Sequence, residues 1–377
     1  MDASVALARA KDGRPAKSML LLGLRGVGKT VLLNRIAELA EEAGFLSIML
    51  EAPEDRRIAE LVVPPLRSAL FQMSRTEQAR TVARKALGAL RAFAKAFKVS
   101  VGDFEFSVEP ETGTADSGNL EADLPALMLA AAVAAKQAGR GLALLLDEVQ
   151  YLGSEDLSAL IVTTHRLAQK NLPFLFFGAG LPQLAGIVGE AKSYAERLFD
   201  FRDIGPLDPK AAGMAIATPL RRERVEIDPP ALALILEKTS GYAYFLQEWG
   251  SQTWKAAKES PIRARDVESA SEMVLAAMDQ GFFRVRLDRL TPRERDYVRA
   301  MAELGAGSHR SGEIASMLGI TVEAAGPLRS GLIRKGMIYS PQHGDTAFTA
   351  PLFHEYLKRT MPAWQKPTTG ATRKRSK

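Results

Sequence analysis

The sequence of 377 residues contains no cysteine, which excludes disulfide bonds, thiolate zinc sites and cysteine nucleophiles. No run approaches the ~18 apolar residues needed to span a bilayer, and the longest apolar run, residues 126–135, is alanine-rich. Residues 1–17 contain no apolar segment of the kind found in signal peptides. The four histidines lack the spacing of metal ligands; they are His165, His309, His343 and His354. These absences predict a cytoplasmic protein that does not enter a membrane.

Acidic residues are absent from the C-terminal segment 366–377, which carries five basic residues. The formal net charge of the chain is +6, so the rest of the chain sums to only +1. A nearly neutral body is weak evidence for nucleic-acid binding, whereas a short basic tail attracts polyanions in general. Because residues 363–377 are also rich in Pro, Thr and Gly, we predict that they form a basic disordered tail.

The apolar residues, 46% of the chain, are enough for a sizeable core, and the length allows two or three domains. Residues 18–23 predict a buried strand, residues 29–43 an amphipathic helix and residues 45–51 a second strand. The apolar face expected of that helix consists of Val31, Leu32, Leu33, Ile36 and Leu39. A strand, a glycine-rich turn, a helix and a second strand form a βαβ unit, which implies a parallel sheet.

The chain beyond residue 51 predicts further strands separated by helices. Two helices are expected over residues 55–98, the second rich in Arg and Lys, and a hairpin over residues 99–108. The other predicted strands are residues 141–146, 172–178 and 201–204. From residue 208 to about residue 278 only helical patterns occur, which indicates a separate α-helical domain.

A glycine-rich motif follows the first predicted strand, because residues 23–30 have the spacing G-x-x-x-x-G-K-[ST]. Its glycines let backbone N–H groups surround phosphates, and the helix that begins there directs the positive end of its dipole at them. Lys29 would place a positive charge on the β- and γ-phosphates, and Thr30 would offer its hydroxyl to Mg²⁺. We therefore predict a site for ATP with Mg²⁺. The predicted nucleotide-binding residues are Gly23, Leu24, Arg25, Gly26, Val27, Gly28, Lys29, Thr30 and Val31.

The second half of such a site is expected to be an apolar strand that ends in an acid. Residues 142–148, Leu-Ala-Leu-Leu-Leu-Asp-Glu, have this pattern. Adjacent carboxylates after five apolar residues are costly to place unless a cation or solvent receives them. We predict that Asp147 holds Mg²⁺ together with Thr30, and that Glu148 is the base that orients the attacking water. An ordinary helix-capping Asp-Glu pair is the alternative.

The C-terminal residues predict a helix-turn-helix followed by a hairpin, which is a winged-helix pattern. Thr291, Pro292 and Glu294 start one helix as N-cap, N1 and N3. The candidate recognition helix after Thr321 carries basic side chains and one acid, namely Arg329, Arg334, Lys335 and Glu323. Residues 290–362 contain nine Lys or Arg against seven Asp or Glu, a modest excess for a phosphate-binding module. DNA binding and a protein-contact or structural role therefore both stay open.

Together these motifs resemble those of AAA+ ATPases, and more narrowly the replication-initiator and STAND-adjacent group of bacterial and archaeal ATPases. The resemblance covers about residues 20–360. The segments that carry it are residues 23–30, 144–152, 177–183, 196–199, 204–207 and 240–247. It implies that Arg197 matches the arginine finger, which would reach the γ-phosphate in a neighbouring subunit of a homo-oligomer. Arg202 is the second candidate for this role, and a surface arginine is the alternative.

Three features differ from the pattern of that family. The strand at residues 172–178 leads into Gly178, Ala179 and Gly180 where a polar sensor is expected, which leaves Gln183 as the nearest polar side chain. Residues 241–244 contain no arginine that could contact the γ-phosphate. Only 17 residues precede the first strand, so most of the segment that packs on adenine is missing. These differences favour slow turnover.

We therefore expect a P-loop NTPase α/β domain with a parallel sheet over residues 1–207, an all-α lid domain over 208–289 and a winged-helix domain over 290–362. The expected activity is Mg²⁺-dependent ATP hydrolysis, with ADP as product, coupled to conformational change and to assembly on duplex DNA or a protein partner. Two alternatives stay open: a slowly hydrolysing signalling switch gated by nucleotide, and a winged-helix DNA-binding regulator. A small-molecule kinase is disfavoured, because no second acceptor-binding fingerprint is present.

Overall fold

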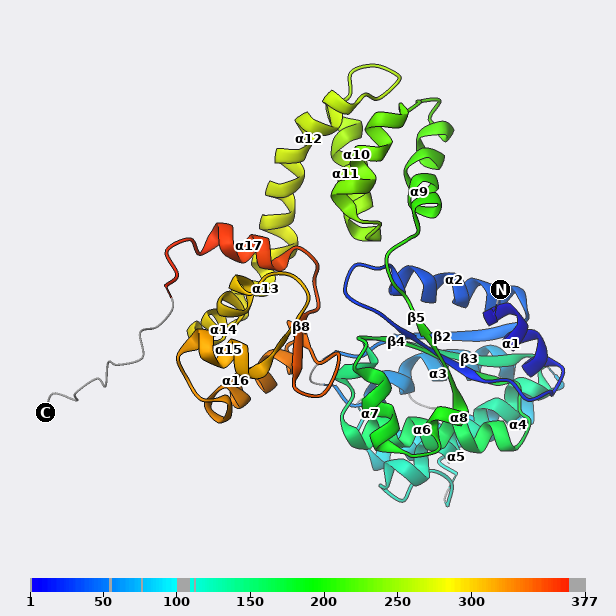
Figure 1. Ribbon diagram of the computed structural model, residues 1–377. Helices are drawn as coiled ribbons and strands as arrows, with labels where there is room; N and C mark the ends of the chain where they lie inside the picture. Colours follow the sequence, from blue (N-terminus) through cyan, green and yellow to red (C-terminus); the bar gives the residue numbers. More distant parts are fainter. Residues whose placement is uncertain (1, 54–55, 76, 100–108, 112, 366–377) are drawn as a thin grey trace, which may run out of the picture. The chain divides into compact units, whose positions relative to one another are not determined.

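The computed structural model describes residues 2–53, 56–75, 77–99, 109–111 and 113–365 (Figure 1). The predicted hairpin at residues 99–108 lies outside these residues except for its first position, and so does the predicted tail beyond residue 365. The chain forms two compact units. The first comprises Met1–Gly23 and Lys29–Ile204, and the second comprises Leu24–Gly28 and Gly205–Lys377.

The first unit is built on a five-stranded sheet with the order β2-β3-β4-β1-β5, and all of its strand pairs are parallel. Its strands are β1 (Ser18–Leu22), β2 (Phe45–Glu51), β3 (Gly141–Asp147), β4 (Phe174–Gly180) and β5 (Phe199–Asp203). The parallel sheet predicted from the βαβ pattern is thus confirmed. The carboxyl ends of β1 and β3 point to the same edge, because each is paired in parallel with β4 between them.

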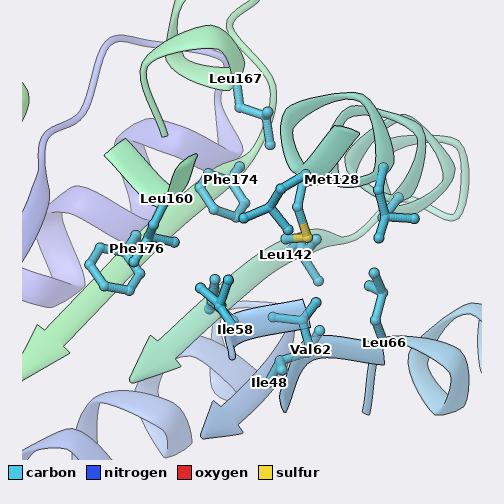
Figure 2. Close-up of a cluster of buried hydrophobic side chains, with 14 of the residues drawn as sticks. Ile48, Ile58, Val62, Leu66, Met128, Leu142, Leu160, Leu167, Phe174 and Phe176 are labelled. Atoms are coloured by element: carbon cyan, nitrogen blue, oxygen red, sulfur yellow. The ribbon is translucent and has the colours of Figure 1, made fainter. Parts of the chain in front are cut away.

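Helices cover both faces of this sheet (Figure 1). Side chains alternate along each strand, so Leu20 and Leu22 of β1 join one apolar cluster while Met19 and Leu21 join another. Figure 2 shows part of the larger cluster, in which β-strand side chains such as Leu142 and Phe176 pack against Met128 and Leu160 of the helices. The helices are α1 (Asp2–Lys11), α2 (Lys29–Glu42), α3 (Ile58–Ser74), α4 (Arg80–Ala96), α5 (Leu120–Gln137), α6 (Ser154–Gln169), α7 (Leu184–Ala191) and α8 (Ala195–Leu198), with the 3-10 helix η1 (Val149–Tyr151).

Two features of the smaller cluster differ from expectation. The apolar face predicted for α2 is wrong at two positions, because Val31 is 66% exposed and Leu32 is 36% exposed. Lys29 takes a buried place at the start of the helix instead. The segment before the first strand was not expected to be helical, yet it forms α1, whose Ala3, Leu7 and neighbouring alanines are buried in the same cluster. Small alanine side chains allow this close packing but produce only a weak periodic signal.

The second unit begins with helices, as predicted. These are α9 (Pro209–Arg222), α10 (Pro229–Thr239), α11 (Ala243–Ala256) and α12 (Ala264–Ala277). The helical course then continues through a π-helical segment η2 (Met278–Phe283) into α13 (Arg284–Asp288). Asp208 and Asp228 cap α9 and α10, each accepting a hydrogen bond from the backbone N–H three residues later. The predicted boundary near residue 289 stays a prediction.

The C-terminal elements are α14 (Pro292–Glu303), β6 (Ser308–Arg310), α15 (Ser311–Leu318), α16 (Val322–Arg334), β7 (Ile338–Tyr339), β8 (Asp345–Phe348) and α17 (Phe353–Thr360). The three strands form an antiparallel sheet with the order β6-β8-β7. Helices and a hairpin occupy the predicted ranges, and β6 is an addition. That these elements form a winged helix stays a prediction. Three residues are too few for an alternating pattern to predict a strand. Among the helices that the structure describes, none is long and apolar enough to cross a membrane.

The arginine expected on the outer face of α16 has an internal role. Arg329 Nε donates to Thr346 Oγ1 at 2.9 Å, and its Nη2 donates to Ser340 Oγ and Asp345 O, both at 2.9 Å. Lys335 is also engaged, because its Nζ lies 2.7 Å from Glu294 Oε2. Two of the three basic side chains predicted for a recognition surface thus hold the unit together.

His354 in α17 makes the stability of the second unit depend on pH. Its side chain is 17% exposed, and burial lowers the pKa of His354 below the usual 6.5, an effect that Glu355 opposes. The unfolded chain therefore binds more protons than the folded chain when the pH falls through 6.5, and folding stability is lost in that range. We expect the free energy of unfolding, measured with urea, to fall between pH 7 and pH 5.

The variant His354→Gln should show a smaller loss of stability over this range, because glutamine does not titrate. The exposed His343 serves as control, and His343→Gln should keep the dependence of the parent protein. An unchanged pH profile in His354→Gln would contradict the assignment.

Candidate functional site

The glycine-rich loop leaves the sheet at the carboxyl end of β1. Gly23 N donates to Gly180 O at 3.1 Å, which ties the first loop residue to the end of the neighbouring strand β4. Lys29 Nζ donates to Gly23 O at 3.0 Å from a side chain in a residue that is only 7% exposed. An ammonium group is costly to bury without oxygen partners. This lysine is therefore held at the edge where a phosphate would add further oxygens.

The inner loop residues, Leu24–Gly28, have the backbone that the motif requires. Gly26 and Gly28 have φ values of 83° and 95°, a region that side chains with a Cβ rarely adopt. Within the second unit, Tyr244 N donates to Gly26 O at 2.9 Å and Arg25 N donates to Thr349 O at 3.1 Å. A Cβ at Gly26 would lie 3.1 Å from Tyr244 Cβ, so glycine is also needed there for close packing.

The predicted metal ligands Thr30 and Asp147 are brought together. Thr30 Oγ1 donates to Asp147 Oδ2 at 2.5 Å, and Glu148 N donates to Asp147 Oδ1 at 2.8 Å. Asp147 is 5% exposed, and its backbone carbonyl accepts a hydrogen bond from Ala52 N. Hydroxyl and carboxylate oxygens suit Mg²⁺, which retains water and binds phosphate oxygens in addition. Among the described residues no group of three or more acidic or histidine side chains forms a separate metal cage.

Glu148 takes a strained backbone conformation directly after β3. Its φ and ψ are 54° and 38°, a left-handed conformation that costs energy for a residue other than glycine. Such strain persists where surrounding contacts hold it in place and is frequent at functional sites. The turn separates the directions of Asp147 and Glu148, so that two neighbouring carboxylates serve different contacts.

Gln150 was not predicted as a site residue, yet it contacts Glu148. Gln150 Nε2 donates to Glu148 Oε2, and Gln150 Oε1 accepts a hydrogen bond from Leu181 N at 3.0 Å. The glutamine therefore links the candidate base to the residue that follows β4. Gln183, the polar residue expected near that strand, is the N-cap residue before α7, and its Oε1 has no hydrogen-bond partner among the described atoms. Only the fold brings residue 150 next to residue 181, so the sequence carried no signal for Gln150.

Arg197 lies at the opposite edge of the sheet from the loop of its own chain. It is part of α8, immediately before β5, and Phe199 of β5 is level with Ser18 at the start of β1. The loop follows the other end of β1, about 13 Å away at ~3.3 Å per residue. Arg197 lines a cavity of about 660 Å³ together with Asp2, Arg9 and Arg202. Its position thus separates it from the loop of its own chain.

Arg202, the second candidate for the finger, is paired inside the first unit. Its Nη2 lies 2.7 Å from Asp200 Oδ2 and 3.2 Å from Asp2 Oδ2. The hydrogen bond to Asp200 raises the pKa of Arg202 above its usual value. Among the described residues no carboxylate forms such a pair with Arg197, which is exposed. The geometry therefore favours Arg197 over Arg202.

Two segments of the chain match known family models. Residues 4–177 match the AAA ATPase domain, and residues 280–357 match a domain of unknown function (DUF8462). No curated protein matches the sequence. The AAA match contains the loop and both acidic residues of the site, so it supports an AAA-type P-loop ATPase domain in this part of the chain.

Several solved structures have similar folds. A Walker-type ATPase of Pyrococcus abyssi has a TM-score of 0.60 and 19% identity over 94% of both chains. The RuvB Holliday junction branch migration motor of Thermotoga maritima has a TM-score of 0.46 and 17% identity over 94% of this chain and 92% of that chain. The ORC1 protein of Aeropyrum pernix in complex with DNA has a TM-score of 0.41 and 17% identity over 95% of this chain and 90% of that chain. The similarity to the first structure is one of fold. The TM-scores below 0.5 for the other two indicate only a distant structural similarity.

Proposed function

We propose that this chain binds ATP with Mg²⁺ at residues 23–30 and hydrolyses the bond between its β- and γ-phosphates. The observation that carries the proposal is the 2.5 Å contact between Thr30 Oγ1 and Asp147 Oδ2. It joins the end of the glycine-rich loop to the acidic end of β3, although the two residues are 117 positions apart. Two motifs that are far apart in the sequence thus meet at one point.

Each side chain has its own role in this proposal. Lys29 neutralises phosphate charge, and the N-terminus of α2 supplies N–H donors to phosphate oxygens. Thr30 and Asp147 hold Mg²⁺, which withdraws charge from the phosphate oxygens when it is bound. Glu148 accepts a proton from the water that attacks the γ-phosphate. Val31 is the exposed apolar residue next to the loop and is assigned to contact with the nucleotide.

Arg197 is assigned to the γ-phosphate of a second copy of this chain. Its position at the far edge of its own sheet supports action between subunits, and its exposure leaves it available for that contact. A guanidinium supplied in this way is worth ~10³-fold or more in rate in known phosphoryl-transfer enzymes. A homo-oligomer follows from this role.

For the second unit we propose a helical lid over residues 208–289, a winged helix over residues 290–362 and a basic tail over residues 363–377. The pairing of Arg329 and Lys335 leaves Arg334 as the exposed basic residue at the end of α16, and Val322 at the start of the helix is an exposed apolar residue. Major-groove reading depends on several polar or basic side chains on one helix face. This unit therefore supports contact with a protein partner better than direct reading of DNA sequence.

A slowly hydrolysing switch is the second candidate function. It is favoured by the end of β4, which is Gly178, Ala179 and Gly180, and by the absence of arginine from residues 241–244. Without these polar contacts the γ-phosphate has fewer groups that stabilise its developing charge. In this case ATP and ADP change the populations of two conformations without rapid turnover.

One experiment separates these functions. ATP hydrolysis is measured with and without duplex DNA, and the mass of the protein is determined in ADP and in a non-hydrolysable ATP analogue. The proposed ATPase should turn over ATP and form an oligomer in the analogue. A switch should bind both nucleotides with hardly any turnover in either condition. Failure to bind nucleotide would contradict both functions, and DNA binding that ignores nucleotide would favour a DNA-binding regulator.

Gln150 should affect turnover without affecting nucleotide affinity. A hydrogen bond to a charged group is worth ~1.5–3 kcal/mol, so we expect Gln150→Ala to lower kcat about tenfold or more while the Kd for ATP stays unchanged. The loss should come from a misplaced Glu148 carboxylate.

The control for this experiment is Gln183→Ala, which removes the other glutamine near the end of β4. It should leave kcat close to that of the parent protein. If Gln183→Ala lowered kcat more than Gln150→Ala did, the contact seen here would not be the relevant one.

A further inference from the structure

The outer face of α4 is a row of basic side chains. Arg80, Arg84, Arg91 and Lys95 fall within about 60° of one another around the helix, given ~3.6 residues per turn. Arg80 and Lys95 are exposed and lie about 22 Å apart along the axis at ~1.5 Å per residue. Lys85 and Lys98 are also exposed on this part of the unit. We call these six residues the α4 basic row.

Charge is distributed unevenly along the chain. Residues 78–99 contain the six basic residues of the α4 basic row and no acid. The net charge of the whole chain is +6, and the segment 366–377 contributes +5 of it. The rest of the chain therefore carries −5. Residues 1–365 are thus nearly neutral in total, although they include the strongly positive segment 78–99.

Three exposed side chains of the α4 basic row form no ion pair with an acid among the described residues. On α2, Arg35 pairs with Glu38 and Glu42, but within the part of the chain that the structure describes no acid pairs with Arg80, Arg84 or Lys95. The backbone of two acidic residues in the segment before α5 contacts the middle of the helix. Glu109 O would lie 3.0 Å from a Cβ at Gly88, and Glu111 N donates to Gly88 O at 3.2 Å.

The side chains of the α4 basic row indicate which class of molecule this surface can bind. The apolar side of α4, including Leu87, Leu90 and Phe93, is fully buried in the core, so it cannot insert into a lipid interface. None of the large apolar side chains exposed on the described residues comes from α3 or α4. Protein interfaces depend on central apolar or aromatic anchors, which this face lacks. A regular row of phosphates needs only the positive charge that the face provides.

We propose that the α4 basic row binds the phosphate backbone of a duplex nucleic acid. Its ~22 Å length spans roughly two-thirds of a duplex turn of ~34 Å, so the side chains can contact several phosphates along one groove edge. These contacts position the duplex without selecting its sequence. This surface goes beyond the proposed ATPase function, because it requires neither nucleotide nor hydrolysis.

The test is the salt dependence of duplex binding by the full chain. A fluorescent duplex DNA is titrated without nucleotide at several salt concentrations, and a duplex RNA of matched sequence forms a second arm. Each phosphate contact adds ~0.9 to the slope of log K against log salt for DNA. We expect the variant Arg80→Gln/Arg84→Gln/Lys95→Gln/Lys98→Gln to lose at least about tenfold in affinity at low salt and about 3–4 in slope.

A matched control removes the same charge from exposed positions in the second unit. This variant is Arg221→Gln/Arg222→Gln/Lys255→Gln/Lys258→Gln, and it should keep the slope of the parent protein within about 1. The variant Glu109→Gln/Glu111→Gln should bind more tightly than the parent, because it removes the two acids next to Gly88. A change in this opposite direction cannot come from misfolding.

The outcomes are decisive. Loss of binding to either duplex in the α4 variant, with the control unaffected, supports the proposal and shows which nucleic acid is preferred. Equal losses in the α4 variant and the control would overturn it, because the effect would then be one of net charge. Binding to vesicles of anionic lipid but to neither duplex would overturn it as well. The variant Lys29→Ala should bind duplex as the parent does, so failure of the ATPase function would remain distinguishable.

Discussion

Replacing Lys29 with alanine is expected to abolish nucleotide binding. The side chain is buried at the carboxyl edge of the sheet, and its Nζ donates to Gly23 O at 3.0 Å. Each hydrogen bond to a charged group is worth ~1.5–3 kcal/mol, so loss of the contacts to two phosphates corresponds to an affinity decrease of about 10²-fold or more. Titration with a fluorescent ATP analogue and calorimetry would measure this decrease.

The matched control is Lys136→Ala, which removes an exposed lysine near the end of α5. It should bind ATP as the parent protein does. Because Lys29→Ala leaves Gly23 O without its lysine donor, thermal unfolding should be recorded for both variants. A folded Lys29→Ala protein that still binds ATP within a few-fold of the parent would exclude the proposed site.

Replacing Glu148 with glutamine should lower ATP turnover and leave ATP binding intact, in contrast to Lys29→Ala. ATP binding should persist while turnover falls by about 10²–10⁴-fold, the usual contribution of a general base. Glutamine has nearly the same size, and its carbonyl oxygen can still accept the hydrogen bond from Gln150 Nε2. Single-turnover hydrolysis of radiolabelled ATP, together with equilibrium binding, would separate the two effects.

Glu190 provides the control for this change, because it is an exposed glutamate at the end of α7. Glu190→Gln should hydrolyse ATP at the rate of the parent protein. Undiminished hydrolysis by Glu148→Gln would remove this residue from the mechanism and leave the ordinary capping interpretation of the acidic pair.

The part of the site that could be predicted consists of residues whose roles are local. The loop glycines need positive φ values, and Lys29 and Thr30 follow them directly in the chain. Asp147 could be placed because five apolar residues identify a buried strand, and parallel strands bring their carboxyl ends to one edge. The meeting of Thr30 and Asp147 was therefore accessible from spacing and topology alone.

The remaining features depend on contacts between distant segments. Gln150 resembles any polar residue after a strand until the fold places it next to Leu181 N. Arg329 has the spacing of a surface arginine, but its guanidinium is held by Ser340 and Thr346 of the hairpin. Val31 has the right period for burial, yet it is exposed beside the loop. In none of these cases does the local pattern give the surroundings of the side chain, and for Val31 it also predicts the wrong exposure.

The residues of the glycine-rich loop are divided between the two units. By their contacts Leu24–Gly28 group with the second unit, whereas the residues on both sides of them group with the first. The chain therefore crosses between units at two peptide junctions inside the loop, and each junction includes a glycine, Gly23 or Gly28. Glycine rotates more freely than other residues. The backbone at both ends of Leu24–Gly28 can therefore take conformations that a residue with a Cβ rarely adopts, and a larger residue at Gly23 or Gly28 would restrict it.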